Sequence, residues 1–256
     1  MRSAPAESRI VPFRAGCPLC GSHKAEPFAE QDGYDFARCR QCRFVYLDPM
    51  PGDDQLAALY NEVGGSDTYL AKRRSRTRRA HLKLLRFLPY AFAKDILDIG
   101  CGGGIMVSAL GRIARRAVGI DISEGAIAFA RATFPRHAFV CADYRETDLA
   151  PDSFDFVHAS EIIEHVNDLG AFMAFLARVT RPGGHVYVTT PDIGHEALPP
   201  DVRQWDVFSP PRHLQFFDQD TLSQVFARHG FVTRRRYRDR KPGLQMLFRM
   251  PQGGGR

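Results

Sequence analysis

The sequence has no apolar run long enough to span a bilayer, and its first residues lack the apolar stretch of a signal peptide. Residues 1–12 instead hold two prolines and little apolar content, which predicts a disordered leader. Internal repeats are also missing, so a repeat architecture is excluded. These absences predict a cytoplasmic protein without a membrane partner.

What the sequence does contain is ordinary for a soluble globular protein, with 44% hydrophobic and 25% charged residues among 256. This length allows one α/β domain with a small appendage, and a core large enough to need no disulfides. The net charge of +6 is concentrated in two basic blocks, 72–79 and 234–241. Such blocks are most often solvated faces, and the alternative is a surface that binds nucleic acid.

Four of the six cysteines form two Cys-x-x-Cys pairs near the N-terminus. The pairs, Cys17-Pro-Leu-Cys20 and Cys39-Arg-Gln-Cys42, are separated by 18 residues. Two such knuckles can supply four thiolates in a tetrahedral array, which predicts a zinc-binding, ribbon-like module over 13–50. An iron–sulfur cluster fits this pattern less well. Four protein ligands leave no open position, so the predicted zinc is structural.

The rest of the chain divides into a helical connector over 51–92 and an α/β domain over 93–256. In the α/β domain, strands alternate with helices, which predicts a parallel, doubly wound sheet. The predicted strands are 95–99, 117–121, 138–141, 154–159 and 185–190, the predicted helices are 103–115, 124–134, 169–180 and 221–229, and a terminal hairpin is predicted from 231–237 and 244–248.

A glycine-rich turn follows the first of these strands, in Ile96-Leu-Asp-Ile-Gly-Cys-Gly-Gly-Gly104. Gly100, Gly102 and Gly104 let the backbone turn sharply and approach a ligand closely. A dinucleotide site begins in a similar way, but its fingerprint needs a glycine where this sequence has Ile105.

Acidic residues stand at regular places around this turn. Asp98 precedes it, where it would repel a pyrophosphate but suits a ligand with an ammonium group and a sulfonium. Asp121 ends the second strand, where a carboxylate can accept from both ribose hydroxyls. Asp143 follows the third strand, where it can accept from an adenine amino group. Together these residues predict a nucleoside site at the carboxyl ends of the strands.

In this order and spacing, the motifs resemble those of class I S-adenosylmethionine-dependent methyltransferases, from residue 95 to about 248. Arg181-Pro-Gly-Gly184, before the fifth strand, belongs to the same resemblance. It implies a Rossmann-like sheet of seven strands with a terminal antiparallel hairpin, and the in-line transfer of a sulfonium methyl group. The cofactor-binding residues it implies are Asp98, Gly100, Cys101, Gly102, Gly104, Asp121, Ile122, Asp143, Tyr144 and Ser160.

The segment after the fourth strand, Ser160-Glu-Ile-Ile-Glu-His-Val166, is where the acceptor should bind. Its Glu-x-x-Glu-His pattern is similar to that of ubiquinone-biosynthesis O-methyltransferases. This resemblance implies that Glu161, Glu164 and His165 hold magnesium beside the acceptor oxygen. In one alternative, Glu161 takes part in catalysis and His165 acts as a base. In the other, these residues only close the pocket and have a structural role.

A long segment, 191–217, separates the fifth strand from the last helix and is predicted to form a substrate lid. It supplies His213 as a second base candidate and Trp205 as a stacking wall for a sugar or aromatic acceptor. The alternative for His213 is a capping or packing role.

The cysteine module and the residues after it also resemble a bacterial subgroup linked to methylation of sugars, surface polysaccharides and secondary metabolites. The predicted acceptor is therefore a small molecule, methylated on a hydroxyl or, as a second choice, on a carbon. The alternative is an rRNA or tRNA base methyltransferase, whose zinc module and basic helix, from about residue 67 to 88, contact RNA. Against this alternative, aromatic residues are not interleaved with the arginines.

Overall fold

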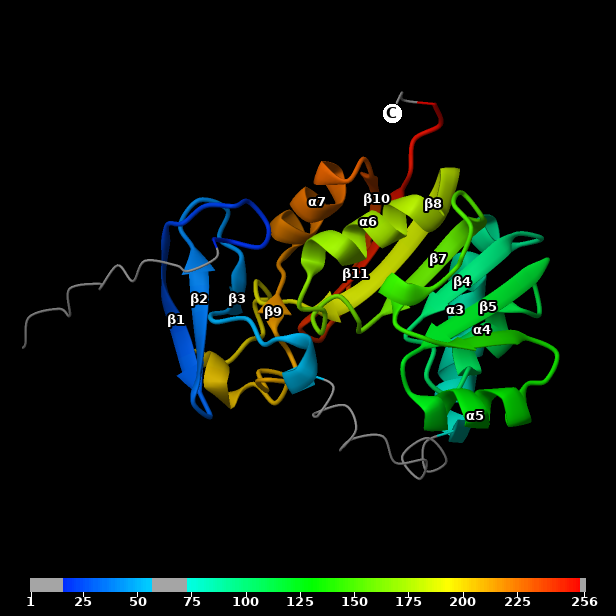
Figure 1. The fold of residues 1–256 in the computed structure, drawn as a ribbon, viewed down its shortest axis with the longest axis horizontal. Coiled ribbons are helices and arrows are strands. Elements are labelled where there is room, and N and C mark those ends of the chain that lie inside the picture. Colours follow the sequence, from blue (N-terminus) through cyan, green and yellow to red (C-terminus); the bar gives the residue numbers. More distant parts are fainter. Residues whose placement is uncertain (1–15, 57–72, 254–256) are drawn as a thin grey trace, which may run out of the picture.

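The computed structural model describes residues 16–56 and 73–253, which form two β-sheets and the helices packed on them (Figure 1). The predicted leader lies outside the described residues, as do residues 57–72 of the predicted connector. Within the described ranges, no helix is both long enough and apolar enough to cross a bilayer.

The larger sheet has seven strands in the order β10-β11-β8-β7-β4-β5-β6. Its parallel part consists of β4 (Asp95–Ile99), β5 (Arg116–Asp121), β6 (Ala138–Cys141), β7 (Phe154–Ser160) and β8 (Thr180–Pro191). β11 (Gly243–Arg249) is antiparallel to both β8 and β10 (Val232–Tyr237). The predicted Rossmann-like sheet is therefore confirmed. The antiparallel strand β11 lies one place in from the edge, with β10 outside it.

Helices cover both faces of this sheet (Figure 1). One face carries α3 (Arg73–Ala91), α4 (Ile105–Leu110) and α5 (Glu124–Thr133), and the other carries α6 (Leu169–Val179) and α7 (Gln219–Arg228). On the first face, the Phe87 ring of α3 packs 5.3 Å from Phe156 of β7. On the second face, Phe226 of α7 stacks on Phe248 of β11, with ring centroids 3.7 Å apart.

Local signals in the sequence determine where these helices begin. Ser123 caps α5, Asp168 caps α6, and Asp218 forms a capping box with Thr221 at the start of α7. The helix after the glycine turn is shorter than predicted, because α4 has six residues and ends before Gly111.

The smaller sheet belongs to the cysteine module and has the order β1-β2-β3-β9. β1 (Ala25–Gln31), β2 (Tyr34–Cys39) and β3 (Val45–Leu47) form an antiparallel meander, and β9 (Gln215–Phe216) joins it from the far side of the sequence. The backbone N–H of Leu47 also donates to Leu214 O at 2.8 Å. The module is therefore joined by backbone hydrogen bonds to the segment that was predicted to be a lid.

Trp205 lies inside this joint and does not face a ligand. It is 8% exposed, and its ring packs 5.8 Å from that of Phe216, in a cluster that also contains Phe36 and Phe208. The expected stacking wall is therefore wrong for Trp205, because the apolar strands of the cysteine module cover it. The domain limits at 13–50, 51–92 and 93–256 stay a prediction.

Candidate active site

The predicted nucleoside site begins at the turn between β4 and α4. Gly100, Gly102 and Gly104 have φ angles of 65°, 48° and 76°, conformations that other residues rarely adopt. A Cβ at Gly100 would lie 2.0 Å from Ile162 Cδ1, and one at Gly104 would lie 2.7 Å from the Phe139 ring. At both positions the positive φ favours glycine, and at Gly104 an added Cβ would also crowd the Phe139 ring.

Asp121 ends β5 beside this turn. Its two carboxylate oxygens accept hydrogen bonds from the backbone N–H groups of Gly102 (2.7 Å) and Ser123 (2.9 Å). Burial raises the pKa of Asp121, and these two N–H groups oppose that change. The next residue, Ile122, is 48% exposed. A fixed carboxylate at the end of this strand suits a ribose hydroxyl, and contacts of Asp121 and Ile122 with the cofactor stay a prediction.

Two further residues of the predicted cofactor set, Asp98 and Cys101, are buried under the turn. Asp98 is 3% exposed, and its carboxylate lies 2.7 Å from Nδ1 of His158 on β7. Cys101 packs against Gly119 of β5, where an added Cβ would meet its Sγ at 2.7 Å. Its backbone N–H donates to Ile120 O. Both residues support the turn from below, and direct contact with a ligand stays a prediction for each.

Asp143 and Tyr144 follow β6, and their side chains already have partners within the protein. Arg145 holds both oxygens of Asp143, through its Nε (3.1 Å) and its Nη2 (2.8 Å). The Tyr144 ring packs against Phe172 and Phe175 of α6, with centroids 5.2 and 5.6 Å away. Contacts of these two residues with adenine stay a prediction.

Two carboxyl groups meet at the end of β7. Glu161, whose φ is 57°, accepts from Thr189 Oγ1 at 2.7 Å, and this hydroxyl also contacts that of Ser160 at 2.6 Å. Glu164 is fully buried and accepts from Thr190 Oγ1 at 2.9 Å. Its other oxygen, Oε1, has no hydrogen-bond partner among the described residues. Burial and then the charge of Glu161 raise the pKa of Glu164 well above its usual range, which favours its neutral form.

Two histidines lie against this buried carboxyl group. Nδ1 of His165 and Nδ1 of His213 donate to the backbone oxygens of Arg212 and Val207, both at 2.5 Å. Because Nδ1 carries the proton, the lone pair of each neutral ring is on Nε2. The ring centroids are 4.7 Å apart. Burial lowers the pKa of both rings, to about 4 for His165, so both are neutral at pH 7.

The cluster that forms differs from the predicted magnesium set. One ligand atom from each of Glu164, His165 and His213 lies within 4.8 Å of the others, whereas Glu161 is hydrogen-bonded to Thr189. Two of the three donors in this cluster are imidazole nitrogens, but magnesium prefers oxygen ligands. The prediction of magnesium at Glu161, Glu164 and His165 therefore receives no support from the arrangement.

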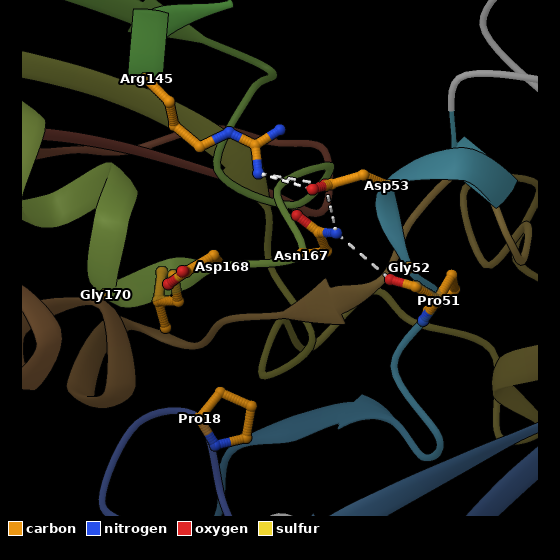
Figure 2. Close-up of a pocket in the computed structure, with 9 residues that line it drawn as sticks. Pro18, Pro51, Gly52, Asp53, Arg145, Asn167, Asp168 and Gly170 are labelled. Carbon is orange, nitrogen blue, oxygen red and sulfur yellow. Dashed lines mark hydrogen bonds and ion pairs between the residues drawn. The ribbon is translucent and has the colours of Figure 1, made fainter.

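A pocket of ≈ 510 Å³ opens between the cysteine module and the start of α6 (Figure 2). Asp53 lines it together with Arg145 and Asn167: Arg145 Nη1 is 3.1 Å from both carboxylate oxygens of Asp53, and Asn167 Nδ2 donates to Oδ1 at 2.9 Å. Pro18 of the cysteine module lines the pocket on another side, as Figure 2 shows. Asn167 comes two residues after His165 in the sequence, but Glu164, His165 and His213 are not among the residues that line this pocket.

Sequence reasoning missed several residues of the site. Asp53 and Arg145 are 92 residues apart, and no local pattern marks their contact. Thr189 and Thr190 were included in a buried strand without a functional role. His158 carried a usable signal, since a polar residue inside a buried strand must find a partner, and the adjacent strand offers Asp98.

The four N-terminal cysteines are gathered as predicted. Cys17 Sγ lies 3.6 Å from Cys42 Sγ, and Cys20 Sγ lies 3.5 Å from Cys39 Sγ. All four sulfur atoms are within 4.8 Å of one another. A tetrahedral site with Zn–S bonds of about 2.3 Å has sulfur atoms about 3.8 Å apart, so this donor set fits zinc. Burial raises the pKa of Cys17, and that of Cys42 to about 12, a cost that a bound cation offsets.

Comparison with known proteins identifies the fold and the family. The sequence matches the family described as "Methyltransferase domain" over residues 69–235. A "Ubiquinone biosynthesis O-methyltransferase" of Rhodopseudomonas palustris is 35% identical over 137 residues, which are 46% of this chain and 54% of that protein. A "Probable S-adenosylmethionine-dependent methyltransferase" of Mycobacterium tuberculosis is 30% identical over 162 residues, 60% of this chain and 55% of that protein. The chain thus spans about half the length of these curated relatives.

Solved structures share the fold at lower identity. The N-methyltransferase NodS of Bradyrhizobium japonicum, in complex with S-adenosyl-L-homocysteine, has a TM-score of 0.59 and 19% identity, over 78% of this chain and all of that one. An S-adenosylmethionine-dependent methyltransferase of Mesorhizobium loti has a TM-score of 0.56 and 23% identity, over 66% of this chain and 97% of that one. The family match covers more than half of the sequence and includes the glycine turn and Asp121. The chain therefore belongs to the class I S-adenosylmethionine-dependent methyltransferases.

Proposed function

We propose that the protein transfers the methyl group of S-adenosylmethionine to a hydroxyl group of a small molecule. The observation that carries the cofactor assignment is the carboxylate of Asp121, which the glycine turn holds beside the exposed Ile122 at the end of β5. The bound cofactor supplies an electrophilic methyl group on a sulfonium. The residues of this chain bind it, orient the acceptor for in-line attack and exclude water.

Titration calorimetry tests the cofactor assignment. We expect the purified protein to bind S-adenosylmethionine and S-adenosylhomocysteine and not to bind NAD, because Ile105 replaces the last glycine of the dinucleotide fingerprint. Tight binding of NAD, with no heat from either sulfur compound, would overturn the proposal.

The pocket in Figure 2 supports an acceptor that carries several hydroxyl groups, such as a sugar or a polar metabolite. Carboxylate, guanidinium and amide groups from Asp53, Arg145 and Asn167 line it, and these groups recognise hydroxyls by hydrogen bonding. The O-methyltransferase names among the relatives favour oxygen as the methylated atom. Methylation of a carbon is the second choice.

A hydroxyl acceptor loses its proton during transfer, and His213 is the base that we propose. Its Nε2 carries the lone pair, and its Nδ1–H is fixed by Val207 O. His165 has the same geometry, but burial lowers its pKa to about 4, so it is a weak base. The hydrogen bond from His165 to Arg212 O holds the chain next to His213, which is a positioning role.

Replacing His213 with asparagine tests this assignment. We expect kcat to fall by roughly 10²–10⁴-fold, the usual contribution of a general base, with little change in cofactor affinity. Because burial lowers the pKa of His213, the wild-type rate should be constant around pH 7 and should decline only below pH 6.5, where the ring protonates. His195→Asn, in the same segment, serves as the control. A His213→Asn enzyme with normal kcat would contradict the assignment.

We also propose that Cys17, Cys20, Cys39 and Cys42 bind one zinc ion with a structural role. The sulfur spacing supports this proposal, and four protein ligands leave no position for a substrate.

A further inference from the structure

One side of α3 exposes apolar residues at helical spacing. Leu82, Leu85, Leu88 and Phe92, which follows the helix, are 65%, 79%, 41% and 63% exposed. They are four of the six large hydrophobic residues that are exposed in the described ranges. Residues three to four apart share one side of a helix, so these four form a continuous strip, called here the outer stripe. Over eleven residues the stripe is about 15 Å long.

The outer stripe is not the core-facing side of the helix. Ala80, Phe87 and Ala91 occupy that side and are almost fully buried against the sheet. Arg86 fixes the helix further, since it donates to Tyr187 Oη at 3.1 Å and lies over the Tyr237 ring. The helix therefore cannot turn the stripe inward without losing its packing on the sheet. Exposed apolar surface on a fixed element indicates a binding surface.

Exposed arginines lie near both ends of the outer stripe. The sequence of α3 contains seven lysine and arginine residues and no acidic residue. Arg78 is exposed one turn before Leu82. Beyond Phe92, the backbone N–H of Ala93 donates to Ile113 O, and this bond brings the loop with the exposed Arg112 to the end of the stripe. An anionic partner is therefore favoured at both ends of the stripe.

We infer that α3 attaches the protein to the surface of an anionic membrane. The leucines and Phe92 would enter the boundary between headgroups and acyl chains, and the arginines would contact lipid phosphates. A second copy of this chain fits less well, because pairing two helices without acidic residues brings like charges together. RNA would satisfy the arginines and leave the outer stripe in water. Attachment of this kind needs no membrane span.

The start of α3, which belongs to the proposed membrane-binding helix, lies on the same side of the sheet as the cofactor site. A short turn joins α3 to β4, so the helix runs antiparallel to the strand (Figure 1). The first turns of α3, where most of its arginines occur, therefore lie towards the sheet edge that carries the glycine turn.

Co-sedimentation of the full chain with vesicles tests the inference. We expect binding to phosphatidylcholine vesicles that contain phosphatidylglycerol, and little binding to phosphatidylcholine alone. The triple variant Leu82→Gln, Leu85→Gln, Phe92→Gln should bind the anionic vesicles at least about tenfold more weakly. Val232→Gln, which changes an exposed apolar residue on β10, is the matched control and should bind like the wild type. Equal thermal melting of all the proteins shows that folding is unchanged.

Three outcomes would overturn the inference. In the first, the wild type stays in the supernatant when anionic vesicles are sedimented at physiological salt. In the second, the triple variant sediments with the vesicles as the wild type does. In the third, measured without vesicles, the wild type forms a dimer or binds RNA tightly, and the triple variant does neither. That result would assign the outer stripe to self-association or to RNA.

Discussion

Replacing Asp121 with alanine should weaken the binding of S-adenosylhomocysteine by roughly 30- to 1000-fold, or about 2–4 kcal/mol. In the proposed complex, the carboxylate accepts hydrogen bonds from both ribose hydroxyls. The expected loss of binding free energy is the sum of these two charge-assisted hydrogen bonds. Asp121 also holds the glycine turn through Gly102 N–H at 2.7 Å, so the variant loosens the ligand-facing backbone as well. Titration calorimetry measures the change directly.

Two further variants separate binding from folding. Asp121→Asn keeps the size of the side chain and an oxygen for one of the two N–H groups, so its loss of affinity should be smaller than that of the alanine variant. Asp148→Ala, which removes an exposed acidic residue after β6, should leave both affinity and melting temperature unchanged. If Asp121→Ala binds the ligand as tightly as the wild type does, the ribose site is not at β5, and the cofactor assignment loses its main support.

The sheet and the cofactor edge could be predicted because their signals are local. β4 is a run of five buried residues, and Gly100 follows it where only a positive φ allows the turn. Ser123 and Asp168 are capping residues, and each begins a helix at the predicted place. In each case, residues adjacent in sequence determine the conformation, so the pattern carries the information without tertiary contacts.

The acceptor side could be predicted only in part, because long-range contacts build it. β9 has only two residues, too few to show a strand period, and it becomes a strand because β3 offers it an open edge. The same contact buries Trp205, which was predicted from its place in the long segment 191–217 to face a ligand. It also brings His213 close to Glu164, although the two are 49 residues apart in the sequence. The cluster therefore contains His213 in place of Glu161, which the local sequence pattern predicted.

Removing the zinc ligands should therefore affect catalysis, although the cysteines are not in the active site. β3 carries the effect: Leu47 N–H donates to Leu214 O, and Leu214 N–H donates to Glu164 O, both at 2.8 Å. Gln215 extends the path, since its Nε2 donates to Ile163 O at 2.7 Å and Val166 O at 3.0 Å. The cysteine module thus supports the segment with Glu164 and His165 through backbone hydrogen bonds.

We expect the wild type to contain about one equivalent of zinc and Cys39→Ser to contain little, because one thiolate of four is lost from a buried site. Binding of a structural zinc contributes on the order of 10 kcal/mol to folding a small module, so β1, β2 and β3 should unfold in the variant. Hydrogen exchange should then rise in 25–47 and also in 161–166 and 205–217. Methyl transfer should be lost, while affinity for S-adenosylhomocysteine stays close to that of the wild type, because β4, β5 and the glycine turn do not contain the contacts that are lost.

Cys141→Ser, which changes a cysteine outside the cluster, should keep both zinc and activity. Full zinc content in Cys39→Ser would contradict the ligand set, and normal exchange at 161–166 after zinc loss would contradict the coupling between the module and the acceptor site.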